Sequence, residues 1–331
     1  QTCALPIYEI APDLTLTIGA RGFIANVNTD GFIGVPRSAL LAGCTVPLLA
    51  PDACGNLDRH VHESGETHRL NLNWQLDKDR MVYATYSTGF RPGGPNNQPT
   101  VRPYGADTLD NFEVGFKTSW FDRLRFNGAV YFEQWNGLQY RLVSPGNNGQ
   151  IGTYNAGQAH VFGAESDAQW LVTQHLTLSA SAAYNDARLS RDLCNLDSTL
   201  NPLTACAPGP AMAAPKGTRL PSQPPFKFTG TARYELPVGR WQGYIQAGLQ
   251  YQSGTRSYLS IVEDQLLGDT PAFATVDFSL GARYRTSSVE VFVQNAFDTR
   301  GQLSRNTFCA IKICSNSSRI YPIRPQFFGV R

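Results

Sequence analysis

The stretch Phe-Ala-Thr-Val-Asp-Phe-Ser-Leu-Gly-Ala-Arg-Tyr, residues 273–284, alternates apolar with polar side chains over most of its length. Val276, Phe278 and Leu280 fall on one side of an extended chain. Asp277 and Ser279 fall on the other. Because successive side chains of a strand point to opposite faces, this pattern predicts a strand with one apolar face and one polar face.

Alternation of this kind restarts about twelve times and predicts an all-β, antiparallel fold. Most stretches reach about ten residues, the length that a tilted strand needs to cross a bilayer. In a soluble sandwich the apolar faces would cover each other, whereas in an outer-membrane barrel they face lipid and the polar faces line a wet lumen. The predicted strands are 13–25, 67–76, 81–90, 109–119, 124–135, 161–171, 176–187, 226–236, 242–254, 273–285, 289–295 and 325–331.

The connections between these strands form two alternating classes. Tight turns lie at 77–80, 120–123, 173–175, 237–240 and 286–288. Long loops lie at 26–66, 91–108, 144–160, 188–225, 255–272 and 296–324. One end of the sheet should therefore carry turns and the other loops, as in bacterial barrels with short periplasmic turns and long extracellular loops. A Greek-key sandwich would mix both kinds at both ends.

The composition agrees with a β-barrel and excludes other classes. Apolar residues make up 42% of the 331 residues, which argues against disorder. The formal net charge of +2 indicates no nucleic-acid partner. No apolar run approaches the roughly 18–20 residues of a transmembrane helix. The start at Gln1 shows no signal peptide, so we expect the chain to be a piece of a longer protein.

The tryptophans support the membrane interpretation. Of five, Trp74, Trp120, Trp170 and Trp241 lie in or beside the short turns. Tryptophan prefers the bilayer interface, so this placement is typical of one half of an aromatic girdle. The alternative is that these rings cap the core of a soluble fold.

Six of the seven cysteines fall in pairs within single long loops. Such pairs predict local disulfides in an oxidising compartment. Zinc binding is the alternative, but no C-x-x-C pair is present. Cys3 is left over beside the start of the chain. The candidate pairs are Cys44 with Cys54, Cys194 with Cys206, and Cys309 with Cys314.

Short motifs occur in a fixed order along the chain. They read YATYSTGFRPGG at 83–94, LDNFEVGFK at 109–117, YNAGQA at 154–159 and VQNAFD at 293–298. Two further motifs follow: FNGAVYF at 126–132 comes after the second motif, and GAE at 163–165 comes after the third. Each motif alone is weakly specific, but together the sequence resembles the TonB-dependent outer-membrane receptors over nearly its whole length.

The resemblance implies a 22-stranded transmembrane barrel, plugged by an N-terminal domain, that takes up scarce nutrients, usually ferric siderophores. Residues 1–331 would supply the C-terminal portion, about twelve strands, without the plug. The implied partners are outer-membrane lipid, an extracellular ferric chelate, and the TonB energising complex, reached through the missing N-terminal region. The implied location is the bacterial outer membrane, and no cofactor is expected. The end at Arg331 departs from the aromatic residue that usually terminates such barrels.

Other functions stay open on the sequence alone. A passive outer-membrane diffusion channel would share the barrel, and a soluble lectin-like surface protein would share the strands. An enzyme is not expected, because no nucleophile elbow, Walker loop or zinc-protease helix is present. An outer-membrane hydrolase with its nucleophile and base on adjacent strands at the rim is the one enzyme class that fits the architecture.

Ligand binding is expected at the outer loops and the adjoining strand ends. Arginines there could meet an anionic chelate through charge-assisted hydrogen bonds. The alternative is that the aromatic residues belong to the outer girdle. The candidate ligand residues are Phe90, Arg91, Tyr104, Trp135, Tyr140, Tyr154 and Tyr258, and Arg102, Arg141, Arg256 and Phe308 belong to the same zone.

One group of residues is metal-like. It consists of His60, His62, Glu63, Glu66 and His68. Histidines two apart on a strand share a face and could both bind one ion. The alternative is a polar, solvated loop that enters the strand at residue 67.

Overall fold

The structure is a computed structural model that describes residues 2–4, 6–31, 46–47, 54–55, 57–97, 101–143, 151–197, 201–307 and 318–331. Most of these residues lie in long antiparallel strands, and the helix α1 (Ile261–Leu267) has seven residues. Within the described ranges, no helix has both the length and the hydropathy of a membrane span.

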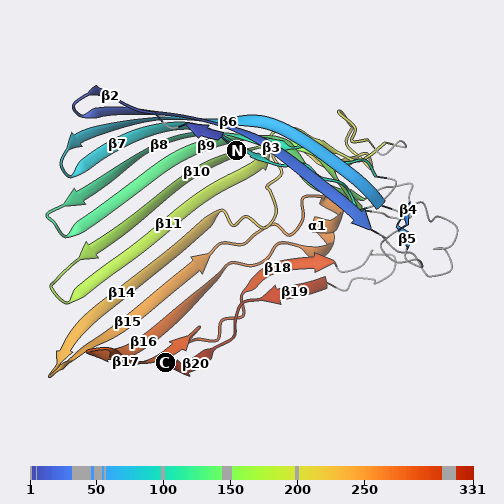
Figure 1. Cartoon of the computed structure of the whole chain (residues 1–331). Coiled ribbons are helices and arrows are strands. Elements are labelled where there is room, and N and C mark those ends of the chain that lie inside the picture. Colours follow the sequence, from blue (N-terminus) through green and yellow to red (C-terminus); the bar gives the residue numbers. More distant parts are fainter. Residues whose placement is uncertain are drawn as a thin grey trace.

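Fourteen strands form one antiparallel sheet, in which neighbours along the chain are also neighbours in space (Figure 1). The order is β1-β3-β6-β7-β8-β9-β10-β11-β14-β15-β16-β17-β20, and β2 also pairs with β3. The bounds are β1 (Thr2–Ala4), β2 (Ile7–Ala11), β3 (Leu14–Gly31), β6 (Leu57–Asp77), β7 (Arg80–Arg91), β8 (Asp107–Trp120), β9 (Leu124–Val143), β10 (Ile151–Leu171), β11 (Leu176–Leu189), β14 (Phe226–Val238), β15 (Trp241–Gln252), β16 (Phe273–Tyr284), β17 (Ser287–Gln294) and β20 (Phe327–Val330).

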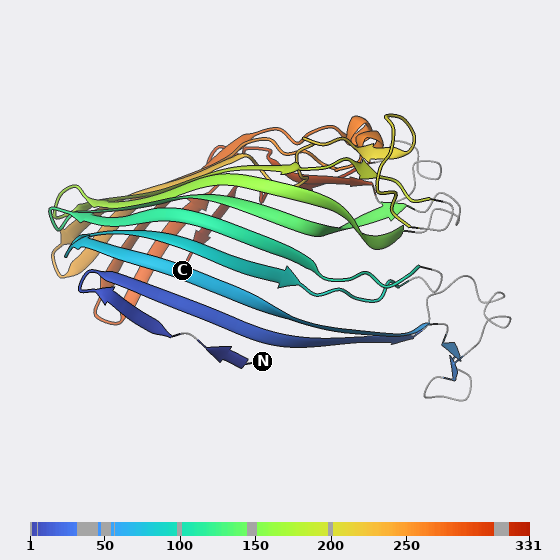
Figure 2. The same cartoon turned by 90° about the horizontal axis from the view of Figure 1, so that it is seen from above.

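The sheet curves into an open trough (Figure 2). The strands at its two edges, β1 with β2 and β20, pair only with β3 and β17 respectively among the described strands. All twelve predicted strands are present in the predicted order, so the all-β antiparallel architecture is confirmed.

The two ends of the trough differ as predicted. Tight turns join the strands at one end, whereas the long connections gather at the other (Figure 1). We call the second the outer end. Its connections carry α1 and the short strands β4 (Val46–Pro47), β5 (Cys54–Gly55), β12 (Leu193–Cys194), β13 (Met212–Ala214), β18 (Gln302–Thr307) and β19 (Ser318–Pro322).

Several predicted bounds were wrong. β6 begins at Leu57, ten residues before the predicted start, and β3 continues to Gly31. The predicted metal-like group therefore lies within a strand and not in a loop. β9 and β10 also extend farther toward the outer end than predicted. The edge strands β1 and β2 were not predicted, because they are short and are separated near Pro6.

The sheet has one apolar face and one polar face. Ala84, Val114 and Val130 lie in one row across β7, β8 and β9. Val114 is 57% exposed and Val130 is 50% exposed, so no second layer covers this row. On the opposite face, Glu113 pairs across to Thr85. An uncovered apolar face opposite a polar one is typical of a sheet that meets lipid outside and water inside, and we call the polar face the inner face.

The tryptophans beside the turns lie on the apolar face. Trp74, Trp120, Trp170 and Trp241 are each 39–53% exposed. They do not cap a buried core, so the soluble alternative for these rings is wrong. They lie at the turn end of the sheet, where the girdle was predicted.

Tyrosine rings lie across glycines on the inner face. A Cβ atom added at Gly115 would come within 2.5 Å of the Tyr83 hydroxyl and 2.6 Å of its Cζ atom. The same hydroxyl donates a hydrogen bond to Glu113 Oε1 at 2.7 Å. The glycine therefore lets an aromatic side chain pack flat against the neighbouring strand.

Gly115→Ala is expected to destabilise the sheet by about 1–2 kcal/mol, because the Tyr83 ring must leave its site and loses its bond to Glu113. The measurement is the urea midpoint of the protein in detergent. Gly248→Ala is the matched control, since its Cβ would meet only Asp277 Cβ, at 3.9 Å. Equal midpoints for the two variants would contradict the role of Gly115.

Candidate functional site

A pocket of about 450 Å³ lies on the inner face near the outer end. Alternation places Gly89 and Arg91 on the face of Thr85, and cross-strand pairing places Leu109 beside Trp135. The pocket is lined by Gly89, Phe90, Arg91, Asp107, Leu109, Glu133, Trp135, Val161, Asn185, Ala187, Leu220 and Gln223. Three of the seven predicted ligand residues, Phe90, Arg91 and Trp135, are therefore brought together in one place.

Arg91 is held by an ion pair inside this pocket. Its Nη2 atom donates to Asp107 Oδ2 at 2.5 Å, and Asp107 is only 2% exposed. The backbone N–H of Gln139 donates to the same oxygen at 3.2 Å. The guanidinium carbon lies 5.4 Å from the centre of the Trp135 ring, within cation–π range. Half of the Arg91 side chain stays exposed to solvent.

The pocket combines apolar walls with few charges. Trp135, Leu109, Val161 and Leu220 present apolar surface. The charged lining residues are the paired Arg91 and Asp107, together with Glu133. Such a site can hold an organic ligand by its apolar surface and orient it through the cation and the carboxylate.

Two polar side chains bind backbone groups of residues 92–93, after β7, and 105–106, before β8. Glu63 accepts the N–H of Gly93 at 2.8 Å and that of Ala106 at 2.7 Å. The Nε2 atom of Gln139 donates to the carbonyls of Pro92 and Gly105, both at 3.0 Å. Glu63 is thus a loop anchor, and both of its carboxylate oxygens are occupied by backbone N–H groups.

A buried apolar cluster, which we call the cap core, lies next to the pocket. It joins β9, β10 and β11 to the connection between β11 and β14, to Val101 from the connection before β8, and to Leu259, two residues before α1. Elsewhere the sheet is a single layer, so this end is where the fold resembles a globular domain. The buried members are Val101, Leu138, Leu142, Tyr154, Ala159, Val161, Ala187, Leu189, Leu193, Leu196, Ala213, Ala214, Leu220 and Leu259.

Two of the predicted ligand aromatics belong to the cap core. Tyr154 is 6% exposed, and Tyr140 packs against the cluster. Tyr140 lies near the outer end of β9, beyond the residues needed to cross a bilayer. Burial raises the pKa of its hydroxyl to about 12. Neither residue lines the pocket, whereas Trp135, which also packs against the cluster, does.

The other predicted residues of this zone are dispersed. Tyr104 forms a backbone bridge with Gly94, and Tyr258 accepts a bond from Arg256 through its carbonyl at 2.7 Å. Arg256 is also paired with Asp264 at 3.0 Å. Arg102 and Arg141 are exposed and do not line the pocket. Phe308 lies outside the described residues.

Phe90 has a second partner besides the pocket. Its ring stacks on that of Phe23, with centroids 3.4 Å apart and planes 5° apart. This contact joins β7 to β3 across β6, which fixes the strand end from which Arg91 projects.

The three histidines of the metal-like group do not converge. His60 pairs with Asp58 at 2.8 Å, and His68 pairs with Glu66 at 3.4 Å. His62 lies 2.5 Å from the side-chain oxygen of Asn26. Each imidazole therefore has its own polar partner, and no ion could bridge all three in this arrangement.

Cys194 and Cys206 form a disulfide, with Cα atoms 5.8 Å apart. Cys194 is 1% exposed and follows Leu193 of the cap core. The bond thus holds the connection that also supplies Leu220 to the pocket. Cys44, Cys309 and Cys314 lie outside the described residues, as does the side chain of Cys54, so those two pairs stay predictions.

The sequence did not indicate several residues that build the site. Asp107 and Gln139 act through hydrogen bonds to residues far away in the sequence, which follow no periodic pattern. Leu220 and Gln223 come from a connection whose path depends on the cap core. The Asp-x-Leu pattern at Asp107 was one available signal, because alternation puts its carboxylate on the inner face beside Arg91.

Comparisons with known proteins agree with this architecture. The family described as TonB dependent receptor-like, beta-barrel matches residues 7–296. The crystal structure of the ferric yersiniabactin uptake receptor FyuA from Yersinia pestis is similar, with a TM-score of 0.71 and 16% sequence identity, over 98% of this chain and 43% of that receptor. For the ferric-catecholate import receptor Fiu from E. coli K12, the TM-score is 0.67 and the identity 18%, over 99% of this chain and 43% of that one.

A similar fold also occurs in the copper transporter OprC, with a TM-score of 0.62 and 16% identity, over 98% of this chain and 45% of that one. The chain therefore spans less than half the length of these solved structures. At such identities the likeness shows the fold alone, whereas the family match extends over most of the sequence. The chain belongs to the family of TonB-dependent receptor-like β-barrels.

Proposed function

We propose that this chain is the C-terminal part of the barrel of an outer-membrane receptor for energy-dependent uptake of a ferric siderophore. The observation that carries the proposal is the family match over residues 7–296, together with a sheet that is apolar on its uncovered face. The similar structures FyuA and Fiu are a ferric yersiniabactin uptake receptor and a ferric-catecholate import receptor. In this proposal the plug and the segment that contacts the TonB complex belong to the parent protein.

The pocket at the outer end is the proposed place of first contact with the ligand. Phe90, Arg91 and Trp135 are the proposed contact residues, and we give the aromatic walls the larger part. The reason is charge: Asp107 already neutralises Arg91, and Glu133 adds a second carboxylate. An anionic chelate would have to draw Arg91 partly away from Asp107, whereas an aromatic or aliphatic body of the chelate needs no such exchange.

The parent receptor is tested by iron uptake. A strain that expresses it under iron limitation is given a panel of radiolabelled ferric siderophores, with and without the energising complex. Uptake of one chelate only when the complex is present is the expected result. Leakage of many small solutes regardless of energy would support the passive channel and overturn the proposal.

The pocket is tested separately, by ligand affinity. Arg91→Ala is expected to weaken binding of the transported chelate about tenfold, the effect of one charge-assisted hydrogen bond. Arg141→Ala is the matched control, because Arg141 is exposed at the same end and does not line the pocket. Unchanged affinity in Arg91→Ala would remove Arg91 from the proposed contacts, even where uptake itself is confirmed.

A further inference from the structure

The outer ends of β3 and β6 form a two-stranded ribbon that is separate from the pocket. β6 pairs with β7 only from Arg69 onward, so residues 57–68 pair with β3 alone among the described strands. Within the ribbon, Asp30 lies directly opposite Asp58, and Asn28 lies opposite His60. Because side chains alternate along strands, these four residues share one face.

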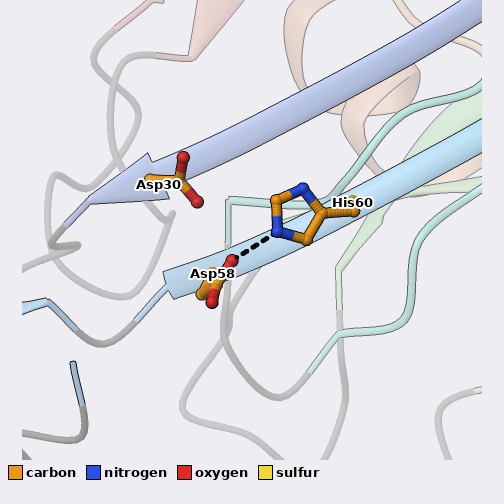
Figure 3. A group of neighbouring side chains, drawn as sticks. All are labelled: Asp30, Asp58 and His60. Atoms are coloured by element: carbon orange, nitrogen blue, oxygen red, sulfur yellow. Dashed lines mark ion pairs between the residues drawn. The ribbon is translucent and has the colours of Figure 1, made fainter.

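Three of these side chains converge at the tip of the ribbon (Figure 3). Asp30, Asp58 and His60 each offer one ligand atom, and these three atoms lie within 4.8 Å of one another. His60 Nε2 is 2.8 Å from Asp58 Oδ1. All three residues are exposed to solvent, so small side-chain rotations can adjust these distances.

The electrostatics of the tip favour a bound cation. Two carboxylates directly opposite each other on neighbouring strands repel and destabilise the pair. Within the described part of the chain, no Lys or Arg is ion-paired with Asp30 or Asp58. A divalent ion between the carboxylates would replace this repulsion with attraction, and His60 supplies a neutral nitrogen ligand.

We propose that Asp30, Asp58 and His60 bind a divalent transition-metal ion, for which Zn²⁺ is the probe. Two carboxylate oxygens and one imidazole nitrogen suit the borderline ions of this series. With bonds of about 2.0–2.1 Å, tetrahedral ligand atoms lie roughly 3.3 Å apart. His60 Nε2 and Asp58 Oδ1 are 2.8 Å apart, so they would have to separate slightly to admit the ion. Water completes the coordination at the exposed side. The site is distinct from the pocket and from the proposed chelate uptake.

The test is Zn²⁺ binding to the tag-free parent receptor in detergent, by titration calorimetry, with Co²⁺ absorption as a second readout of coordination. His60→Gln and Asp30→Asn are each expected to weaken Zn²⁺ binding at least about tenfold. His68→Gln is the matched control, because His68 on the same strand also pairs with one acid, Glu66, but has no second carboxylate beside it among the described residues. It should bind Zn²⁺ like the wild type.

Zn²⁺ affinity that is unchanged in His60→Gln, or lowered equally in His68→Gln, would overturn the proposal. Circular dichroism of each variant shows whether the sheet is intact, and substitutions at these exposed positions are expected to leave it so. Arg91→Ala should bind Zn²⁺ normally. A wrong uptake proposal would therefore leave Zn²⁺ binding unchanged, whereas a wrong metal-site proposal would leave chelate uptake unchanged.

Discussion

Leu193→Ala is expected to loosen the outer end of the molecule while the long strands stay folded. Leu193 is 0% exposed and lies in the cap core. Truncating a buried leucine lowers the free energy of unfolding by about 2–5 kcal/mol, because apolar burial is lost and a cavity is left behind. The cap core holds the connection between β11 and β14, whereas the rest of the sheet has no buried apolar layer that depends on Leu193.

The measurement is limited proteolysis of the parent receptor, with the fragments identified by mass spectrometry. New cleavage between 189 and 225 is expected, together with an unchanged temperature at which the barrel loses its resistance to detergent unfolding. Leu266→Ala is the matched control, since Leu266 is 36% exposed on α1 at the same end. Loss of the whole barrel in Leu193→Ala would show that the cap core and the sheet unfold as one unit.

The disulfide limits how far this loosening can spread. Cys194 and Cys206 stay linked in the variant, which keeps the unfolded connection short. Adding dithiothreitol to Leu193→Ala should therefore increase cleavage further, and the same treatment of the wild type should increase it less, because there the cap core still holds the connection.

The strands and their order could be predicted from the sequence, because alternation is a local property. β7 and β16 differ from their predicted bounds by only one residue at an end. The prediction failed at β6, whose first ten residues have only two apolar side chains, Leu57 and Val61, and so carry too little alternation of hydropathy. Such a stretch is a strand because β3 pairs with it, which a single sequence does not reveal.

The candidate site could be predicted only in part. Phe90 and Arg91 follow from a strand end beside a Pro-Gly-Gly turn, and Trp135 follows from its place at the end of a predicted strand. Tyr140 and Tyr154 look equivalent to them in sequence, but Tyr154 is buried in the cap core and Tyr140 packs against it outside the pocket. The difference arises from the path of the 190–225 connection, which is set by long-range apolar contacts and not by local pattern.

The pair of Arg91 and Asp107 gives the second large expected effect. Removing Arg91 leaves the Asp107 carboxylate, 2% exposed, without its cation. Breaking a buried ion pair from one side costs about 3–5 kcal/mol, and the half-exposed Arg91 places this case at the lower end. Arg91→Ala is thus expected to lower the stability of the outer end, measured by proteolysis and by the urea midpoint.

Asp107→Asn in the Arg91→Ala background is expected to restore a large part of that stability. An amide of similar shape cannot ionise, and its oxygen can still accept the N–H of Gln139. Ligand affinity should stay low in the double variant, because the cation that we propose for chelate binding is still absent. Recovery of both properties would instead show that Arg91 acts on the ligand only by neutralising Asp107 and so holding the pocket in shape.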